Sequence, residues 1–315
     1  MIHTRQLRRT FKSRRGPVEA VAGVDLDVLG GQTFGFLGPN GAGKTTTLRM
    51  LSTLMPPTSG QATVAGFDLR REPGRVRERI GYVSQEGSSY EDVTGRRELV
   101  IQGRLYGMGR AEAQRRAAEL LESLELVDCA DRKTKTYSGG QKRRLDVGIG
   151  LMPLPDLLFL DEPTTGLDPQ SRARMWDEVR RLRESGTTVF LTTHYLEEAD
   201  ALCDRIAIID HGKIVAEGTP DELKRQVAGD VVLVGTDGPT ERAHDILKGQ
   251  DFIRELTEED GALRLYVDRG ETAMPQIIRL LDGAGVTLAT LSLHRPSLDD
   301  VFFRKTGRSL RETAA

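Results

Sequence analysis

The chain has 315 residues, of which 38 % are hydrophobic and 29 % are charged, a balance typical of a soluble protein with one large domain or two modest ones. Its 45 Lys and Arg residues against 47 Asp and Glu residues give a formal net charge of −2, which argues against a general nucleic-acid binder. The longest apolar runs, such as 157–160, fall far short of the roughly 20 residues of a membrane-spanning helix, so we expect the chain not to cross a bilayer by itself. Cys129 and Cys203 have no CxxC or disulfide spacing, which favours a reducing cytosol.

The first 15 residues are basic and carry no acid. Such a segment is usually a solvated basic edge, and contact with phosphate or lipid headgroups is the alternative. Through about residue 216, short apolar runs alternate with segments of helical periodicity, which is typical of an α/β layer architecture. We expect strands at 32–37, 157–160, 188–191 and 206–209, and helices at 44–54 and 110–126.

The pattern changes after Gly218-Thr219-Pro220. A short helix at 221–227 is followed by strands at 231–234, 252–256, 263–267 and 287–293 and helices at 241–247 and 272–281, with a turn at Asp260-Gly261. This order, βαββαβ, matches the ferredoxin-like split unit, so we expect a smaller α+β domain over residues 220–315. A last helix begins near Ser297, with two aspartates in its first turn.

The segment Gly38-Pro39-Asn40-Gly41-Ala42-Gly43-Lys44-Thr45 fits the pattern G-x-x-x-x-G-K-[ST] between an expected strand and an expected helix, which is the context that this nucleotide-binding motif requires. Its glycines let backbone N–H groups cradle phosphate oxygens, and the following helix N-terminus adds the positive end of its dipole. Lys44 supplies a charge for the β- and γ-phosphates, and Thr45 supplies a hydroxyl for Mg²⁺. We assign Thr46, the next residue, to the same nucleotide site.

A second candidate site is the apolar run 157–160, which ends in Asp161-Glu162-Pro163. In phosphate-loop enzymes an acid at the end of a strand holds Mg²⁺, and Asp161 fits that role. Glu162 would then lie at the γ-phosphate, where a carboxylate could orient or deprotonate the attacking water. An isolated acidic pair usually starts a loop or caps a helix, but the phosphate loop upstream favours the functional interpretation.

Between these two motifs, Tyr137-Ser138-Gly139-Gly140-Gln141 resembles the signature motif of ATP-binding-cassette (ABC) ATPases. Taken alone, the four residues from Ser138 would be an ordinary turn, but their order and spacing relative to the other motifs are those of the family. The resemblance covers about residues 1–218. It implies an ATP-binding domain over residues 1–219, with an α/β P-loop NTPase core and a helical subdomain at about 86–150. It also implies hydrolysis of ATP with Mg²⁺ as cofactor.

Four more residues match landmarks of the family, and their roles are what the resemblance implies. Phe11, where Tyr is commoner, resembles the aromatic residue that stacks on adenine; a core strand residue is the alternative. Gln85 resembles the Q-loop glutamine, which reaches Mg²⁺ or its water. Asp168 resembles the D-loop aspartate that faces a partner subunit, and His194 resembles the switch histidine at the γ-phosphate.

The family resemblance also implies a head-to-tail homodimer with ATP at the interface. One subunit would contribute Lys44, Thr45, Gln85, Asp161, Glu162 and His194, and the other would contribute Ser138, Gly139, Gly140 and Gln141. The catalytic group would be Gln85, Glu162 and His194, and the Mg²⁺ group would be Thr45, Gln85 and Asp161.

Two further segments resemble one branch of the family, the daunorubicin/doxorubicin resistance type: Lys142-Arg143-Arg144-Leu145 and the stretch 296–303. The second could also be an ordinary amphipathic helix. This branch implies an exporter ATPase on the cytoplasmic side of the membrane, with a separate integral membrane permease that contacts the segment from Gln85 to Met108. Residues 220–315 would then be a regulatory or dimerisation domain, and no nucleic acid is expected. An importer ATPase and a non-transport ABC ATPase are the alternatives.

Overall fold

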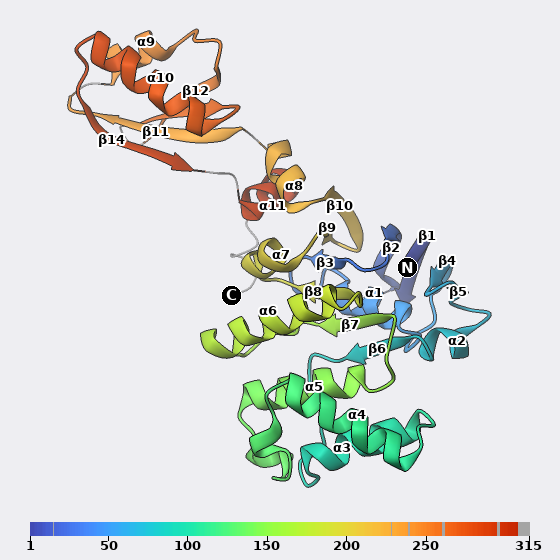
Figure 1. Cartoon of the computed structure of the whole chain (residues 1–315). Helices are drawn as coiled ribbons and strands as arrows, with labels where there is room; N and C mark the ends of the chain where they lie inside the picture. The colour runs from blue at the N-terminus through green and yellow to red at the C-terminus, as the bar shows by residue number, and fades with distance from the viewer. Residues whose placement is uncertain (15, 228, 239, 260–261, 295–296, 308–315) are drawn as a thin grey trace. The chain divides into compact units, whose positions relative to one another are not determined.

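The computed structural model describes residues 1–14, 16–227, 229–238, 240–259, 262–294 and 297–307. The chain divides into two units, one over Met1–Thr219 and one that begins at Pro220 (Figure 1). The first unit combines a parallel sheet with helices and the second holds an antiparallel sheet with helices, so the expected fold class is confirmed. The expected turn at 260–261 lies outside the described residues. Within the described ranges, no helix combines the length and the apolar character that a membrane span requires.

The core of the first unit is a six-stranded sheet of order β10-β9-β3-β8-β7-β6. The strands β6, β7, β8, β3 and β9 pair in parallel, and β10 runs antiparallel to β9 at the edge. The strands span β3 (Thr33–Leu37), β6 (Ile80–Val83), β7 (Leu157–Asp161), β8 (Thr188–Thr193), β9 (Arg205–Asp210) and β10 (Lys213–Gly218). Every residue of β3, β7 and β8 is buried, as expected for central parallel strands covered on both faces.

Two of the helices around this sheet, α1 and α4, begin at the expected residues. The helices around the sheet are α1 (Lys44–Leu51), α3 (Gly95–Leu105), α4 (Arg110–Ser123), α5 (Gly139–Leu151), α6 (Pro169–Glu184) and α7 (Leu196–Leu202), with 3₁₀ turns at Val127–Cys129 and Thr134–Thr136. The expected helices 44–54 and 110–126 are both too long. Each helix ends early because a residue just past its last turn, Thr53 (φ 64°) or Glu125 (φ 54°), adopts a left-handed conformation that cannot continue the helix.

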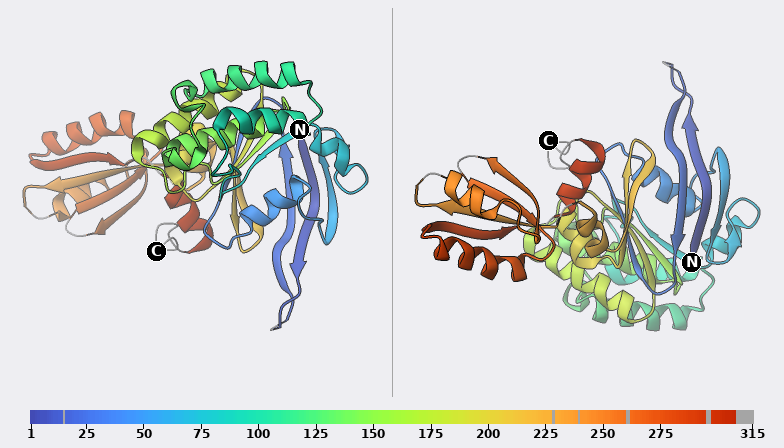
Figure 2. Two further views of the ribbon diagram at one scale, coloured as in Figure 1. Left: turned by 90° about the horizontal axis from the view of Figure 1, so that it is seen from below. Right: turned by 90° about the horizontal axis from the view of Figure 1, so that it is seen from above.

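A second sheet, of order β2-β1-β4-β5, was not expected from the sequence. It consists of β1 (Ile2–Phe11), β2 (Val18–Val28), β4 (Ser59–Val64) and β5 (Phe67–Asp68), followed by α2 (Pro73–Arg77). The β1–β2 hairpin extends beyond the body of the first unit (Figure 2). The basic N-terminal segment therefore forms a strand, and several of its arginines have protein partners. Arg8 pairs with Glu19 at 2.8 Å, and Arg9 donates to the carbonyl oxygen of Pro56 at 2.7 Å.

The second unit contains the expected order βαββαβ. Its elements are α8 (Pro220–Val227), β11 (Asp230–Thr236), α9 (Glu241–Leu247), β12 (Ile253–Glu259), β13 (Ala262–Val267), α10 (Gly270–Gly283), β14 (Leu288–His294) and α11 (Leu298–Thr306). The antiparallel sheet has the order β12-β13-β11-β14, so β13 separates β11 from β12 as in a split βαβ unit. Ser297 caps α11 in a capping box with Asp300, and α11 packs against α8.

Four phenylalanine rings, from three neighbouring strands of the parallel sheet, pack together at the centre of the core. The ring centroids of Phe34, Phe36 and Phe159 each lie 5.6 Å from that of Phe190 on β8. All four side chains are fully buried. Phe190 therefore joins β3 and β7, the two strands that end in the candidate phosphate loop and in the acidic pair.

We expect Phe190→Ala to lower the free energy of unfolding by about 3–5 kcal/mol, because removal of a central ring leaves a cavity among three others. Urea unfolding of the purified chain measures the change. Leu29→Ala is the matched control, because the side chain of Leu29 is 63 % exposed, and it should shift stability by less than about 0.5 kcal/mol. Equal effects of the two substitutions would contradict the central place of Phe190.

Candidate functional site

The loop between β3 and α1 needs glycine at two positions for steric reasons. A Cβ on Gly38 would lie 2.3 Å from the carbonyl oxygen of Ile209, and a Cβ on Gly43 would lie 2.5 Å from that of Ala20. Gly43 also has φ 106°, in the left-handed region, as does Gly41 at 80°. The loop therefore lies tightly against β9 at Gly38 and against β2 at Gly43, where no larger residue would fit.

The start of α1 is suited to an anion. Gly43 is the N-cap, and among the described residues no side chain caps this end of the helix. The backbone N–H groups of the first turn, at Lys44, Thr45 and Thr46, have no partners one turn back in the helix, and they carry the positive end of the helix dipole. Together with the glycine loop, this arrangement fits a phosphate group.

Lys44 is buried beside the loop, with only 4 % of its side chain exposed. Its Nζ donates to the carbonyl oxygens of Gly38 (2.8 Å) and Pro39 (3.1 Å) and lies 3.3 Å from Oε1 of Glu162. Burial lowers the pKa of Lys44, and the negative charges of Glu162 and Asp161 oppose that shift. The ammonium group is therefore fixed between the loop and the end of β7.

Asp161 and Thr45 bring two oxygen ligands together. The Oδ1 of Asp161 accepts hydrogen bonds from the hydroxyls of Thr45 (3.1 Å) and Thr192 (2.6 Å). Burial raises the pKa of Asp161, and these hydroxyl donors oppose the shift. In the part of the chain that the structure describes, no group of three or more His, Cys, Asp or Glu side chains could hold a metal. One hydroxyl and one carboxylate fit Mg²⁺, which takes its remaining ligands from phosphate oxygens and water.

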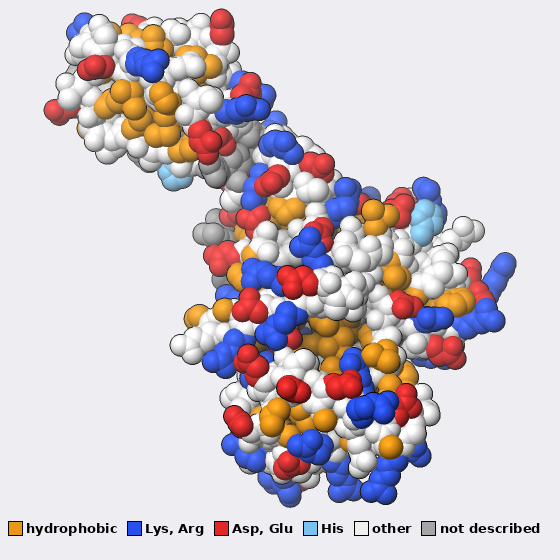
Figure 3. All heavy atoms as spheres, viewed as in Figure 1, with side chains coloured by type: hydrophobic (Ala, Val, Ile, Leu, Met, Phe, Trp, Pro, Cys, Tyr) orange, Lys and Arg blue, Asp and Glu red, His pale blue; other side chains and the backbone are white. Residues whose placement is uncertain are grey.

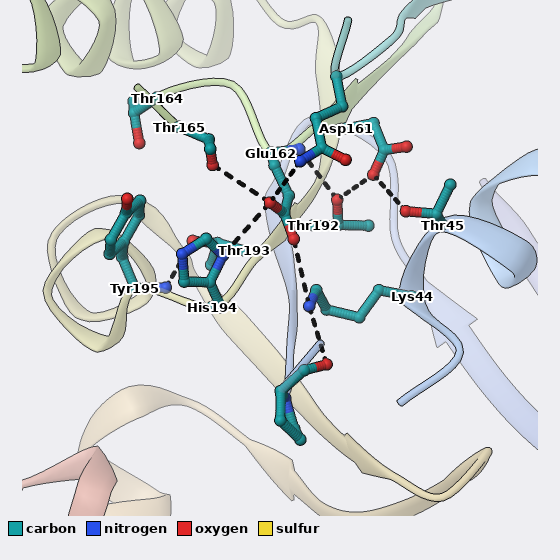
Figure 4. A network of polar contacts seen from close by, with 12 residues as sticks. Lys44, Thr45, Asp161, Glu162, Thr164, Thr165, Thr192, Thr193, His194 and Tyr195 are labelled. Atoms are coloured by element: carbon teal, nitrogen blue, oxygen red, sulfur yellow. Dashed lines mark hydrogen bonds and ion pairs between the residues drawn. The ribbon is translucent and has the colours of Figure 1, made fainter. Parts of the chain in front are cut away.

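Glu162 is the centre of a polar network (Figure 4). Its Oε2 accepts hydrogen bonds from the side chains of Gln85 (3.1 Å) and Thr165 (3.2 Å), and its backbone N–H donates to Oγ1 of Thr192 at 3.0 Å. Nδ1 of His194 lies 3.3 Å from the same Oε2, without the geometry of a hydrogen bond. The backbone of Glu162 has φ 46°, a strained conformation for a residue with a side chain and one that concentrates at functional sites.

The charge of Glu162 is set by its neighbours. Burial alone would raise the pKa of this carboxyl, but the interactions with His194 and Lys44 outweigh it and lower the pKa to about 2. Asp161, the preceding residue, has its pKa shifted in the opposite direction. Glu162 is therefore a stable anion at neutral pH, held ready to accept hydrogen bonds.

Three residues of this network carry no motif and were missed in the sequence: Thr192, Thr165 and Tyr195. Thr192 joins both acids from the adjacent strand β8, and the ring of Tyr195 packs on His194 with centroids 4.1 Å apart. Thr192 lies close to the site because β7 and β8 are neighbours in the sheet. Thr165 and Tyr195 are near Glu162 and His194 in the sequence, but neither belongs to a motif.

A further buried carboxylate, that of Glu198, binds the segment that follows Glu162. Glu198, which is fully buried on α7, accepts hydrogen bonds at Oε1 from Thr164 (2.8 Å) and from the indole N–H of Trp176 on α6 (3.3 Å). Burial raises the pKa of Glu198, and its hydrogen bonds oppose that shift. The segment after Glu162 is thereby tied to two helices.

The remaining predicted residues lie apart from the Glu162 network. Phe11 ends β1, half-buried and outside the core cluster, with the guanidinium carbon of Arg9 4.8 Å from its ring centroid. Ser138 caps α5 and exchanges hydrogen bonds with Gln141 (3.2 and 3.0 Å). Asp168 caps α6 and accepts two hydrogen bonds from Ser171 (2.9 and 2.7 Å).

Gly140 links the last two of these helix starts. A Cβ on Gly140 would lie 2.4 Å from Oγ of Ser171, the residue that Asp168 holds. The start of α5 therefore packs directly on the start of α6, while Ser138, Gly139 and Asp168 stay exposed. Their exposure suits residues that meet a second molecule.

Sequence families match both units. The family described as "ABC transporter" matches residues 21–165, and the family "ATP-binding protein DrrA1-3-like, C-terminal domain" matches residues 218–306. A third, "AAA domain, putative AbiEii toxin, Type IV TA system", matches residues 140–200, inside the first unit. The daunorubicin resistance ATP-binding protein DrrA2 of Streptomyces coeruleorubidus is 46 % identical to this chain over 308 residues, which are 97 % of the chain and 96 % of that protein. The chain belongs to the ABC transporter ATP-binding proteins.

This ABC protein is also 38 % identical to the linearmycin resistance ATP-binding protein LnrL of Bacillus subtilis, over 96 % of the chain and 98 % of that protein. A solved dimeric structure of the ATP-binding cassette MJ0796, in a post-hydrolysis state with ADP and Pi, matches with a TM-score of 0.65 and 26 % identity, over 70 % of this chain and 98 % of that one. The chain is therefore a nucleotide-binding ATPase, and the family resemblance seen in the sequence is confirmed.

We expect Glu162→Gln to lower kcat for ATP hydrolysis by about 100-fold or more while ATP binding is kept, because the amide preserves the shape of the side chain and removes its charge. Phosphate release and ATP binding by the purified full-length chain measure the two effects. We also expect ATP to trap this variant as a dimer in gel filtration.

Glu197→Gln is the matched control for that variant, because Glu197 is an exposed glutamate on α7 and should tolerate the change. If Glu162→Gln hydrolysed ATP at the wild-type rate, a role of Glu162 in hydrolysis would be contradicted.

Proposed function

We propose that this chain is the ATP-hydrolysing subunit of an exporter, and that it powers efflux of a drug or another hydrophobic compound through a separate membrane permease. The observation that carries this proposal is the similarity to a daunorubicin resistance ATP-binding protein over both units, including the C-terminal domain. In this proposal the chain binds peripherally at the cytoplasmic face of the membrane. The domain from residue 220 has a regulatory or dimerisation role.

The geometry around β7 suggests how the work is divided. Lys44 and the start of α1 would hold the phosphates, and Thr45, Asp161 and Gln85 would hold Mg²⁺, which neutralises charge on the phosphate oxygens. With a pKa of about 2, Glu162 is a weak base, so it would act first by orienting the attacking water through a hydrogen bond. His194, beside it, would contact the γ-phosphate.

The exposed helix starts suggest where the second subunit binds. Ser138 and Gln141 present a capped helix N-terminus at the surface, and Asp168 lies at the start of the adjacent helix. In a head-to-tail homodimer, the segment 138–141 of one subunit would complete the nucleotide site of the other, and Phe11 would stack on the base. ATP then joins the subunits and its hydrolysis releases them.

A groove on the first unit suggests the permease contact. A cavity of about 440 Å³ lies between the sheet and α3, and its apolar lining includes Leu54, Tyr82, Ile101 and Leu105. The side chains of Ile101 and Leu105 are 43 % and 76 % exposed, which is high for large apolar residues. In the space-filling view, hydrophobic side chains gather where β6 and β7 meet the segment α3–α5 (Figure 3). An apolar helix of the permease would fit such a groove.

Glu98 adds a polar group to this groove. Its side chain is 6 % exposed, and its Oε1 accepts the backbone N–H of Tyr90 at 2.8 Å. Its Oε2 is buried with no hydrogen-bond partner among the described residues. Burial raises the pKa of Glu98 to about 7, the N–H of Tyr90 opposes the shift, and Asp146 adds to it. A donor from the permease could satisfy the free oxygen.

The raised pKa of Glu98 predicts a pH-dependent stability. The neutral carboxyl favours the folded state, so its contribution is complete below its ordinary value of 4.5 and is lost as the pH rises through about 7. We expect Glu98→Gln to stabilise the chain at pH 8 by on the order of 1–3 kcal/mol and to change little at pH 5.

Urea unfolding at the two pH values measures this effect, with the exposed Glu122→Gln as control. A difference between wild type and Glu98→Gln that is the same at both pH values would contradict the predicted titration.

Affinity purification from solubilised host membranes tests the permease. We expect a polytopic membrane protein to copurify with the tagged chain and with Val127→Asp, since Val127 is 55 % exposed and outside the groove. Ile101→Asp should lose that protein, because a charge in the groove would be buried at the contact. Equal recovery by both variants would contradict the groove, and recovery of ribosomes or DNA would contradict a transport role.

The exported compound is tested in cells that lack the gene. Such cells should retain daunorubicin longer, and the wild-type chain should restore efflux while Glu162→Gln should not. Unchanged retention would contradict export of this class of drug.

A further inference from the structure

Arg143, on the helix that begins at the signature motif, holds three separate segments of backbone. Its Nε donates to the carbonyl oxygen of Pro163 (2.8 Å), its Nη1 to that of Ser84 (2.6 Å) and its Nη2 to that of Asp161 (2.9 Å). The side chain is only 7 % exposed. One guanidinium therefore joins the end of β7, the residue after Glu162 and the residue before Gln85.

Only arginine can make this set of contacts. Its planar fork carries five N–H donors in fixed directions, whereas lysine offers a single point charge on a flexible stem. Burial lowers the pKa of Arg143, and the nearby charges of Asp146, Asp161 and Glu198 oppose the shift. Burying a cation that donates only to neutral carbonyl groups costs desolvation free energy. We therefore infer that Arg143 is present for the fixed geometry of its hydrogen bonds.

Asp146 holds the other end of the same loop from the next turn of α5. Its Oδ1 accepts the backbone N–H groups of Ser88 (2.9 Å) and Ser89 (3.1 Å), and the side chain is 4 % exposed. A Cβ on Gly87 would lie 2.8 Å from Oδ2 of Asp146, so the loop passes close to the carboxylate. Residues 84 and 88–89 are thus fixed to one helix by two side chains of opposite charge.

Gln85 lies between these two anchors. Its Nε2 donates to Oε2 of Glu162 at 3.1 Å, and Glu162 itself lies between Asp161 and Pro163, whose carbonyl oxygens Arg143 holds. Both partners of the Gln85–Glu162 hydrogen bond are therefore positioned relative to α5.

We propose that Arg143 and Asp146 form a clamp of two positioning residues that fixes Gln85 against Glu162 and so couples the start of α5 at Ser138 to the hydrolytic site. A movement of the signature segment 138–141 would then change the position of the catalytic carboxylate of Glu162 through backbone contacts, without a ligand between them. The inference rests on the proposed role of Gln85 beside Glu162. It adds two residues that do not touch the nucleotide.

The first test compares Arg143→Lys with Arg116→Lys. Arg116 is a matched control because it also donates to a backbone carbonyl of α5, that of Leu151 at 3.4 Å, but at the far end of the helix. We expect Arg143→Lys to lower kcat by about 10-fold to 100-fold, with little change in KM for ATP. Hydrogen exchange at residues 84–89 should accelerate in Arg143→Lys and not in Arg116→Lys. Unchanged exchange at residues 84–89 would overturn the clamp.

A double-mutant cycle with Gln85→Ala separates positioning from a general loss of structure. If Arg143 acts through Gln85, the double variant will be about as slow as Gln85→Ala alone. If the two losses multiply, the clamp is wrong while the role of Gln85 stands. If Gln85→Ala keeps full activity, the proposed role of Gln85 fails and the clamp fails with it.

Variants of Asp146 provide an independent test of the clamp if Arg143→Lys does not fold. Asp146→Asn keeps an oxygen that can accept the N–H groups of Ser88 and Ser89, whereas Asp146→Ala removes it. We expect kcat to be lowered in Asp146→Ala and largely recovered in Asp146→Asn. Equal loss in both variants would overturn the positioning role of Asp146.

Discussion

Two adjacent carboxylates, Asp161 and Glu162, are buried at the end of β7, and the surrounding site is arranged to stabilise them. A buried charge is costly unless ion pairs and hydrogen bonds compensate it. Hydroxyl groups from α1 and β8 bond to Asp161, and the ammonium of Lys44 lies beside Glu162. Their pKa values shift in opposite directions, so two neighbouring acids acquire different chemistry from their environments alone.

The parts of this site that the sequence predicts are those whose chemistry is local. The phosphate loop could be recognised because its glycines, its lysine and the helix start are consecutive. The contacts of Thr192 and Arg143 could not, because they cross between elements that only the folded sheet brings together. The early ends of α1 and α4 were also missed. Thr53 and Glu125 adopt left-handed conformations, which are rare for threonine and glutamate and are not predicted by their sequence.

The same reasoning explains success and failure at the level of the fold. In the second unit, buried residues alternate along the two central strands, with Val232 and Val234 on β11 and Leu263 and Leu265 on β13, so the local sequence of these strands shows their period. The N-terminal sheet was missed because β1 is rich in arginine and shows only Ile2 and Leu7 as large buried apolar residues. Its strand character comes from pairing with β2 in a hairpin and with β4, which is distant in sequence.

The hydrogen bond between Trp176 and Glu198 gives the protein a spectroscopic label of its own. Trp176 is the single tryptophan of the chain, and it is half-buried on α6. Its indole N–H shares an oxygen of Glu198 with Thr164, two residues beyond Glu162. Indole emission depends on the polarity and hydrogen bonding around the ring. Intrinsic fluorescence at one wavelength therefore reports on the segment that follows Glu162, with no dye and no engineered residue.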